Sequence, residues 1–280
     1  PPELTAESYI LMDAATGQVL AEKDPDSLRY PASTTKLMTL ALVLEGCGGD
    51  LTPQLTVSES AVTAVGPGSS SIFLRPGETL SLEDAVWAAL LESANDAANV
   101  LAEHAAGSIE AFVARMNQKA AELGLQSTHF ANPSGYHSEQ HYTTARELAL
   151  ITRWALTVPG FAELLGGVSH TMPGNPVHPA ERQMLTDNRL LLDDPPYPGL
   201  VGGKSGWTPE AHFTMVEAAE REGRTLIVVT LACPRKADRF AGCAALLDYG
   251  FEHFVPVQAD AARLGLPPLP VVCGGERLGE

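Results

Sequence analysis

Residues 201–232 read VGGKSGWTPEAHFTMVEAAEREGRTLIVVTLA and contain three apolar segments separated by short polar stretches. Val201–Trp207, His212–Ala219 and Thr225–Ala232 each have the length of a strand, and Glu220–Gly223 provides a turn between the last two. These residues predict three consecutive antiparallel strands late in the chain.

Strands are also expected at the amino end. Tyr9–Met12 and Gln18–Ala21 are short apolar segments on either side of Ala14–Gly17, which is typical of a hairpin. The sequence therefore places strands at both ends of one domain.

Helical patterns fill the middle of the chain. Thr34–Glu45 has helical apolar spacing and stops before Gly46, and Thr144-x-x-Glu147 is a capping box. Pro and Gly become dense from Pro159 to Gly199, which predicts long surface connections. We predict an α+β fold in which an antiparallel sheet built from both chain ends is flanked by helices, with a mostly helical subdomain inserted at about residues 45–195.

Composition sets limits on function. The 280 residues are 45% hydrophobic and carry a net charge of −16, so a folded domain is expected and a nucleic-acid partner is not. No apolar run reaches the roughly 18 residues of a membrane span, and membrane anchoring is not evident. We expect a catalytic domain over 1–254, followed at 255–280 by a linker or the truncated start of another domain.

No metal or cofactor is expected. The four cysteines lack C-x-x-C spacing, and Cys233 and Cys243 are more simply interpreted as small buried residues than as a disulfide. His137 and His141 are four residues apart but follow a loop signal, and no carboxylate completes a ligand set.

Three short motifs occur once each and in one order: Ser33-Thr34-Thr35-Lys36, Ser93-Ala94-Asn95 and Lys204-Ser205-Gly206. Each is weak alone, since an S-x-x-K pattern arises about once by chance in a chain this long. Together they have the order that a serine acyl-transfer site requires.

The first motif supplies a nucleophile and its base. Lys36 lies one helical turn after Ser33, and a lysine made neutral by burial and by a second cation, Lys204, can accept the serine proton. The alternative is a helix-capping serine beside a surface lysine.

The other two motifs complete this interpretation. Ser93 would bridge the two lysines and relay a proton to the leaving group, and the Asn95 amide would hold Lys36 and the substrate backbone. The alternative is a helix–helix turn capped by Asn95 or Asp96. Lys204-Ser205-Gly206 would begin an edge strand that binds an extended peptide, rather than a mere glycine-rich loop. The backbone N–H groups of Ser33 and Trp207 would then form an oxyanion hole.

The chain resembles the serine D-alanyl-D-alanine carboxypeptidases, which are low-molecular-mass penicillin-binding proteins. The resemblance covers about residues 7–254 and includes the segments Tyr30-Pro31-Ala32-Ser33-Thr34-Thr35-Lys36, Ser93-Ala94-Asn95-Asp96-Ala97-Ala98, His129-Phe130-Ala131-Asn132-Pro133-Ser134-Gly135, His141-Tyr142-Thr143-Thr144-Ala145-Arg146 and Asp248-Tyr249-Gly250-Phe251. It implies a β-lactamase/transpeptidase-like fold and hydrolysis of the terminal D-Ala-D-Ala bond of peptidoglycan stem peptides. It also implies acylation by β-lactams, the absence of a cofactor, and export to the periplasm or the outer face of the cytoplasmic membrane.

The resemblance further implies a substrate-binding set of Ser205, Gly206, Thr208 and Arg239. Arg239 and the hydroxyl of Ser205 would hold the substrate's terminal carboxylate, although a surface ion pair is an alternative for Arg239. His212 stands where the family usually has glycine, and it matters only if its side chain points into the crevice.

Several rival functions remain open. A β-lactamase would want an acid–base carboxylate between the second and third motifs, where Glu181 and Asp187 lie, although Thr186–Leu191 is closer to the carboxypeptidase pattern. A DD-endopeptidase would need a more open crevice, and a non-catalytic muropeptide-binding protein would be expected to have degraded motifs.

Overall fold

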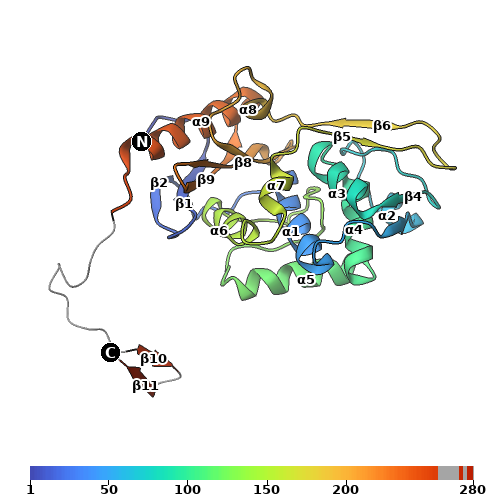
Figure 1. Cartoon of the computed structure of the whole chain (residues 1–280), viewed down its shortest axis with the longest axis horizontal. Helices are drawn as coiled ribbons and strands as arrows, with labels where there is room; N and C mark the ends of the chain where they lie inside the picture. The colour runs from blue at the N-terminus through green and yellow to red at the C-terminus, as the bar shows by residue number, and fades with distance from the viewer. Residues whose placement is uncertain (258–270, 274–275, 280) are drawn as a thin grey trace.

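The computed structural model describes residues 1–257, 271–273 and 276–279 (Figure 1). The helical segments are η1 (Ala32–Thr35), α1 (Lys36–Cys47), α2 (Glu59–Thr63), α3 (Leu82–Leu91), α4 (Asn95–Ala106), α5 (Ile109–Glu122), α6 (Ala145–Ala155), α7 (Phe161–Leu165), α8 (Arg189–Leu192) and α9 (Lys236–His253). The strands are β1 (Ser8–Asp13), β2 (Val19–Lys23), β3 (Gln54–Thr56), β4 (Thr79–Ser81), β5 (Ser169–Met172), β6 (Arg182–Leu185), β7 (Leu200–Thr208), β8 (His212–Arg221), β9 (Arg224–Cys233), β10 (Val271–Cys273) and β11 (Glu276–Gly279).

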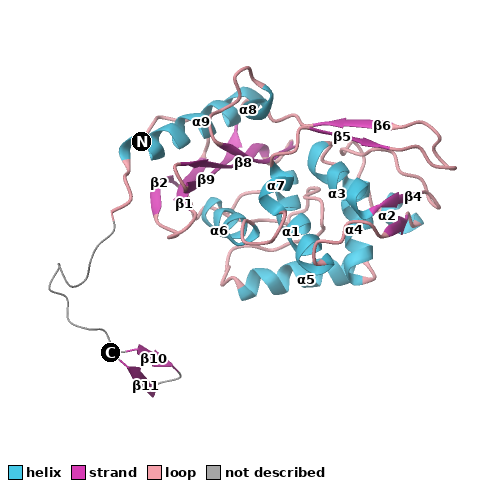
Figure 2. Cartoon of the chain, viewed as in Figure 1, coloured by secondary structure: helices cyan, strands magenta, loops and turns pink. Residues whose placement is uncertain are grey.

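The predicted α+β fold is confirmed. Five antiparallel strands form a sheet in the order β2-β1-β9-β8-β7, so a strand from the amino-terminal region pairs with one from the last fifth of the chain where β1 meets β9 (Figure 2). Helix α9 packs on one face of this sheet and α6 on the other, while α1 to α5 make up the adjoining helical region.

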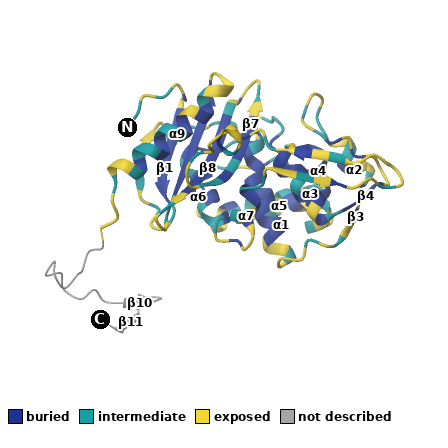
Figure 3. Ribbon diagram, turned by 45° about the horizontal axis from the view of Figure 1, so that its top comes forward, coloured by how far each residue is buried: buried dark blue, intermediate teal, exposed yellow. Residues whose placement is uncertain are grey.

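Alternation along β1 explains why both faces of the sheet are covered. Tyr9 and Leu11 belong to the apolar cluster under α9, whereas Ile10 and Met12 belong to the larger cluster that continues into the helical region. A strand whose residues are buried on both sides needs a layer on each face. Figure 3 shows this burial in β1, β8 and α1.

Several boundaries differ from the sequence predictions. Helix α1 runs through Gly46 and ends at Gly48, which has the left-handed φ of 59° common at helix ends. The capping box at Thr144 is only half formed: Thr144 caps α6, but the Glu147 carboxylate accepts instead from the backbone N–H groups of Gln126 and Ser127.

The stretch from Pro159 to Gly199 is also more ordered than predicted. It contains α7, the antiparallel hairpin β5–β6 and α8 rather than surface connections alone. An ion pair attaches the hairpin to the helical region: Arg182 on β6 contacts Glu78, a fully buried carboxylate, at 2.6 Å. A buried ion pair fixes position because leaving either partner alone is costly.

Cys233 and Cys243 are both buried free thiols, as the simpler interpretation predicted. Of the segment expected at 255–280, residues 258–270, 274–275 and 280 lie outside the described residues, and β10 pairs with β11. None of the helices in the described ranges has the length and apolar character needed to cross a membrane.

Candidate active site

The nucleophile candidate Ser33 lies in η1, one turn before Lys36 opens α1. Ala32, directly before it, has a left-handed φ of 50°, an uncommon conformation for a residue with a side chain that is often found at functional sites. Lys36 is fully buried, so the alternative of a capping serine beside a surface lysine is wrong.

The Lys36 amine is held from three sides. Its Nζ lies 3.1 Å from Ser33 Oγ and 2.7 Å from each of two acceptors, Asn95 Oδ1 and the Ser134 carbonyl oxygen. Burial and the nearby charge of Lys204 place the pKa of Lys36 well below its usual value, against the opposing charge of Asp96. The first and second motifs therefore meet at one amine.

Ser93 and Asn95 lie where α3 gives way to α4. Ser93 has a φ of 55°, and its buried Oγ has no hydrogen-bond partner within the described part of the chain. Asn95 is the first residue of α4, and its N–H donates to Ser70. Asp96 does not cap the helix as the alternative supposed. Its carboxylate accepts hydrogen bonds from the Ser71 hydroxyl and from the backbone N–H groups of Ile72 and Leu74.

The third motif lies on β7, which is the edge strand of the sheet. A methyl group added at Gly206 would come within 2.8 Å of the Ser33 nitrogen, so only glycine allows this approach of strand to nucleophile. Lys204 is buried and donates to the Ser205 carbonyl at 2.9 Å. Burial lowers the pKa of Lys204 to about 8, with Asp187 acting in the opposite direction.

Arg239 reaches the same strand from α9. It is 2% exposed, so the surface ion pair proposed as its alternative is wrong. Its Nη1 donates to the Gly206 carbonyl at 3.3 Å and its Nη2 to Asp187 Oδ2 at 2.7 Å. Ser205 Oγ donates to the other oxygen of Asp187 at 2.7 Å.

Glu217 on β8 was not identified from the sequence. It is fully buried opposite Gly203, and neither carboxyl oxygen has a hydrogen-bond partner among the residues described. Burial raises the pKa of Glu217 to about 8, although the Asn188 amide and the Arg239 guanidinium act in the opposite direction. Its signal in the sequence is one acidic residue inside the apolar run of a strand.

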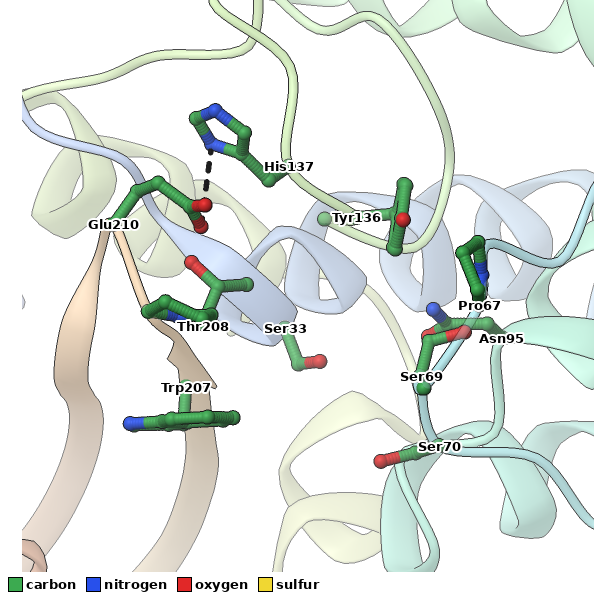
Figure 4. A pocket seen from close by; sticks show the side chains of 13 residues that line it. Ser33, Pro67, Ser69, Ser70, Asn95, Tyr136, His137, Trp207, Thr208 and Glu210 are labelled. Carbon is green, nitrogen blue, oxygen red and sulfur yellow. Dashed lines mark ion pairs between the residues drawn. The ribbon is translucent and has the colours of Figure 1, made fainter.

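Two cavities flank Ser33. The loop-side cavity, of about 300 Å³, is lined by Ser33, Pro67–Ser70, Asn95, Gly135–His137 and Trp207–Glu210 (Figure 4). The arginine-side cavity, of about 250 Å³, is lined by Ser33, Ser70, Leu91–Ser93, Leu185, Asp187, Ser205–Trp207 and Arg239. Of the ten residues predicted for the site, six line the second cavity: Ser33, Ser93, Ser205, Gly206, Trp207 and Arg239. Asn95 and Thr208 line the first cavity, and Lys36 and Lys204 lie behind the walls in contact with Ser33 and Ser205.

Trp207 is 54% exposed and presents its ring to the loop-side cavity (Figure 4). On the same side of that cavity, His137 Nδ1 and Glu210 Oε2 come within 3.8 Å of each other, which links the 131–142 loop to the turn after β7 (Figure 4). Tyr136, His137 and Glu210 were not predicted to line the site, because their common location depends on how two loops fold.

His137 and His141, four residues apart, face different partners: His137 Nδ1 faces Glu210, and the ring nitrogens of His141 face Ala131 and Thr35. His141 Nδ1 accepts from the Ala131 N–H, so the other ring nitrogen carries the hydrogen and donates to Thr35 Oγ1 at 2.8 Å. Burial lowers the pKa of His141 to about 3, which keeps the ring neutral. Within the described ranges, no three His, Cys, Asp or Glu side chains gather as metal ligands would.

His212 does not obstruct the crevice. Its side chain is exposed, and its backbone has a φ of 55° at the start of β8. A left-handed φ explains why glycine is favoured at such a position, since a side chain there is strained.

Comparison with known proteins gives a consistent result. A family model described as D-alanyl-D-alanine carboxypeptidase matches residues 1–234. The chain is 34% identical to the D-alanyl-D-alanine carboxypeptidase DacC of Escherichia coli, over 93% of this chain and 65% of that protein. It is 31% identical to DacF of Bacillus subtilis, over 89% of this chain and 63% of the relative, so it spans slightly less than two thirds of both.

The same architecture occurs among solved structures. The crystal structure of the Streptomyces K15 DD-transpeptidase superposes with a TM-score of 0.81 at 28% identity, covering 90% of this chain and 98% of that one.

Proposed function

The chain belongs to the D-alanyl-D-alanine carboxypeptidase family, and from this membership we propose that it hydrolyses the terminal D-Ala-D-Ala bond of peptidoglycan stem peptides through a Ser33 acyl-enzyme. In this proposal Lys36 is the general base. Residues 1–254 would form the catalytic domain, which acts outside the cytoplasm because its substrate lies there.

The observation that carries the proposal is the arrangement around Lys36. A neutral amine has two N–H groups and one lone pair. The two acceptors at 2.7 Å, Asn95 Oδ1 and the Ser134 carbonyl, account for both hydrogens. The lone pair is then directed to Ser33 Oγ at 3.1 Å, where it can take the hydroxyl proton.

Acylation would follow from this geometry. The Ser33 proton moves to Lys36 as Oγ bonds to the carbonyl carbon between the two D-alanines. The backbone N–H groups of Ser33 and Trp207 would stabilise the oxyanion, a contribution commonly worth a hundredfold or more in rate. Their proximity depends on Gly206, which admits β7 to the Ser33 nitrogen.

The C–N bond would then break as its nitrogen is protonated. Ser93, whose buried Oγ has no partner among the described residues, would pass a proton from Lys36 or Lys204 to the leaving D-alanine. Lys36 is neutral again once its proton has been passed on through Ser93, directly or by way of Lys204. It would then take a proton from the water that attacks the acyl carbon and return it to Ser33 Oγ as the acyl C–O bond breaks.

Substrate recognition is proposed for β7 and α9. An extended peptide would lie along the edge strand at Gly206 and Thr208, with main-chain hydrogen bonds giving its alignment. Ser205 and Arg239 would bind the terminal carboxylate by charge-assisted hydrogen bonds. A β-lactam presents a carboxylate and a strained amide in similar positions, so we expect it to acylate Ser33.

The β-lactamase alternative is less well supported. Both oxygens of Asp187 are engaged by Ser205 and Arg239, and Glu181 is exposed next to the β5–β6 hairpin. Neither carboxylate is therefore available as a base for a deacylating water. A β-lactam adduct that persists for hours would agree with this, and one that turns over within seconds would contradict it.

The proposal is tested by D-alanine release from an acyl-D-Ala-D-Ala peptide, with wild type and Ser33→Ala compared side by side. Release should fall at least a thousandfold in the variant, while its melting temperature stays close to that of wild type. Mass spectrometry should place a penicillin adduct on Ser33. Equal release from both proteins would refute the acyl-enzyme, and cleavage of cross-linked peptides alone would identify an endopeptidase.

A further inference from the structure

Asp187 occupies an unexpected position in the arginine-side cavity. Its two carboxylate oxygens each receive one hydrogen bond of 2.7 Å, one from Ser205 Oγ and the other from Arg239 Nη2. Lys236 Nζ lies 3.6 Å from the second oxygen. Ser205 and Arg239 are the two groups that the proposed function assigns to the substrate's terminal carboxylate.

Asp187 is at the same time accessible to a ligand. Its side chain is 46% exposed and lines the cavity beside Ser33. Burial alone would raise the pKa of Asp187, but the hydrogen bond from Ser205 and the charges of Arg239 and Lys204 keep it below its usual value. A charged carboxylate is therefore already in place when a substrate arrives.

Asp187 and a second carboxylate would compete for the same groups. Ser205 has a single hydroxyl hydrogen, which is given to Asp187, so it cannot donate to both. Arg239 gives one N–H of Nη1 to the Gly206 carbonyl and one of Nη2 to Asp187; it retains further N–H groups, but a carboxylate bound to them would lie next to Asp187. A second carboxylate would also meet the negative charge of Asp187, and two like charges in one site disfavour each other.

We propose that Asp187 is a specificity-determining residue, an internal carboxylate that competes with the substrate's terminal carboxylate for Ser205 and Arg239. The inference rests on the proposed function. A peptide with a free terminal carboxylate must displace Asp187, whereas a peptide whose terminal group is an uncharged amide has no need to. The protein should therefore discriminate little between the two.

The test is a binding measurement that does not depend on turnover. An acyl-D-Ala-D-Ala peptide and its terminal carboxamide are titrated calorimetrically into Ser33→Ala and into Ser33→Ala combined with Asp187→Asn. The acid-to-amide affinity ratio should be within about threefold of one in the first protein and should rise at least tenfold in the second. A purely structural role of Asp187 would change both affinities together and leave the ratio as it was.

Asp193→Asn, in the same background, is the matched control. It removes the same charge six residues away, where Asp193 faces Arg189 at 3.7 Å on the exposed side of α8, so the ratio should not change. A tenfold or greater preference for the acid in Ser33→Ala, or an unchanged ratio after Asp187→Asn, would overturn the inference.

Failure of the proposed function is a separate outcome. If the wild type releases no D-alanine but the affinity ratio still responds to Asp187→Asn, the carboxypeptidase proposal fails and the competition at Arg239 stands. If D-alanine is released but the acid-to-amide affinity ratio does not respond to Asp187→Asn, the carboxypeptidase proposal stands and the competition at Arg239 is refuted.

Discussion

Two walls face each other across Ser33, and they satisfy their polar groups differently. The helical wall consists of Lys36, Ser93, Asn95 and Ser134. There the Lys36 amine has three partners, and Ser93 Oγ has none within the described structure. The sheet wall consists of Lys204, Ser205, Glu217 and Arg239. There, within the described structure, Arg239 Nε and both Glu217 oxygens have no hydrogen-bond partner.

The difference separates two tasks. A base must be positioned before the substrate arrives, so the helical wall fixes Lys36 through hydrogen bonds that do not depend on a ligand. On the sheet wall, charged groups must exchange their present hydrogen-bond partners for those of a bound substrate. The positive charges of Lys204 and Arg239 there lie close to acidic side chains. The pKa values of Lys204 and Glu217, both about 8, place the balance of these charges within an accessible pH range.

The largest effect is expected on the helical wall. Lys36→Met keeps an unbranched side chain, one atom shorter, and removes the amine, so D-alanine release and penicillin acylation should fall by about 10²- to 10⁴-fold. Stopped-flow acylation measures this directly. Lys119→Met, on α5 and remote from the site, is the control and should be acylated at the wild-type rate. Normal penicillin labelling of Lys36→Met would show that Lys36 is not the general base.

On the sheet wall, the effect should depend on pH. If protonated Lys204 is required, kcat/KM falls above pH about 8, by about tenfold per pH unit, because the amine then loses its proton. Lys204→Arg retains the charge and should move this alkaline limb upward.

Glu217 has a similar pKa, so its variant serves to assign the limb. With Glu217→Gln the alkaline limb should stay near pH 8. A limb that disappears in this variant would assign the titration to Glu217 instead of Lys204.

The last expected effect concerns stability rather than rate. The folded pKa of Glu217, about 8, is above its ordinary value of 4.5, so its stabilising contribution is complete below pH 4.5 and is lost as pH rises towards 8. Relative to Glu217→Gln, the wild type should lose about 1.4 kcal/mol of unfolding free energy per pH unit in that window.

Urea denaturation at several pH values measures the difference between the two proteins. Glu220→Gln, an exposed change on the same strand, should follow the wild type. Parallel stability curves for wild type and Glu217→Gln would show that the carboxyl is not kept neutral.

Much of the helical wall could be predicted from sequence. The S-x-x-K spacing places Ser33 and Lys36 on one turn, and the order of the motifs predicts that Asn95 joins them. The Ser134 carbonyl could not be predicted as a ligand of Lys36, because every residue has a carbonyl and only the fold directs one of them to the amine.

The sheet wall was less predictable. Ser205 and Arg239 follow from family resemblance, but the position of Asp187 between them depends on the connection from the β5–β6 hairpin to α8. The surrounding region, Pro159 to Gly199, was predicted as surface connections because its Pro and Gly residues interrupt the patterns of short helices and strands. The strained backbone at His212 likewise has no signature beyond the absence of the usual glycine.

The pairing of β1 with β9 has a consequence for how the protein folds. Ile10 and Val229 are neighbours in the sheet although about 220 residues separate them, so closing the sheet costs chain entropy before any contact repays it. Until β9 is available, the edge of β1 is unpaired and β7 cannot reach Ser33. The helical region can assemble from contacts nearer in sequence, so we expect the nucleophile to be in place early and the ability to acylate it to appear only at the last stage of folding.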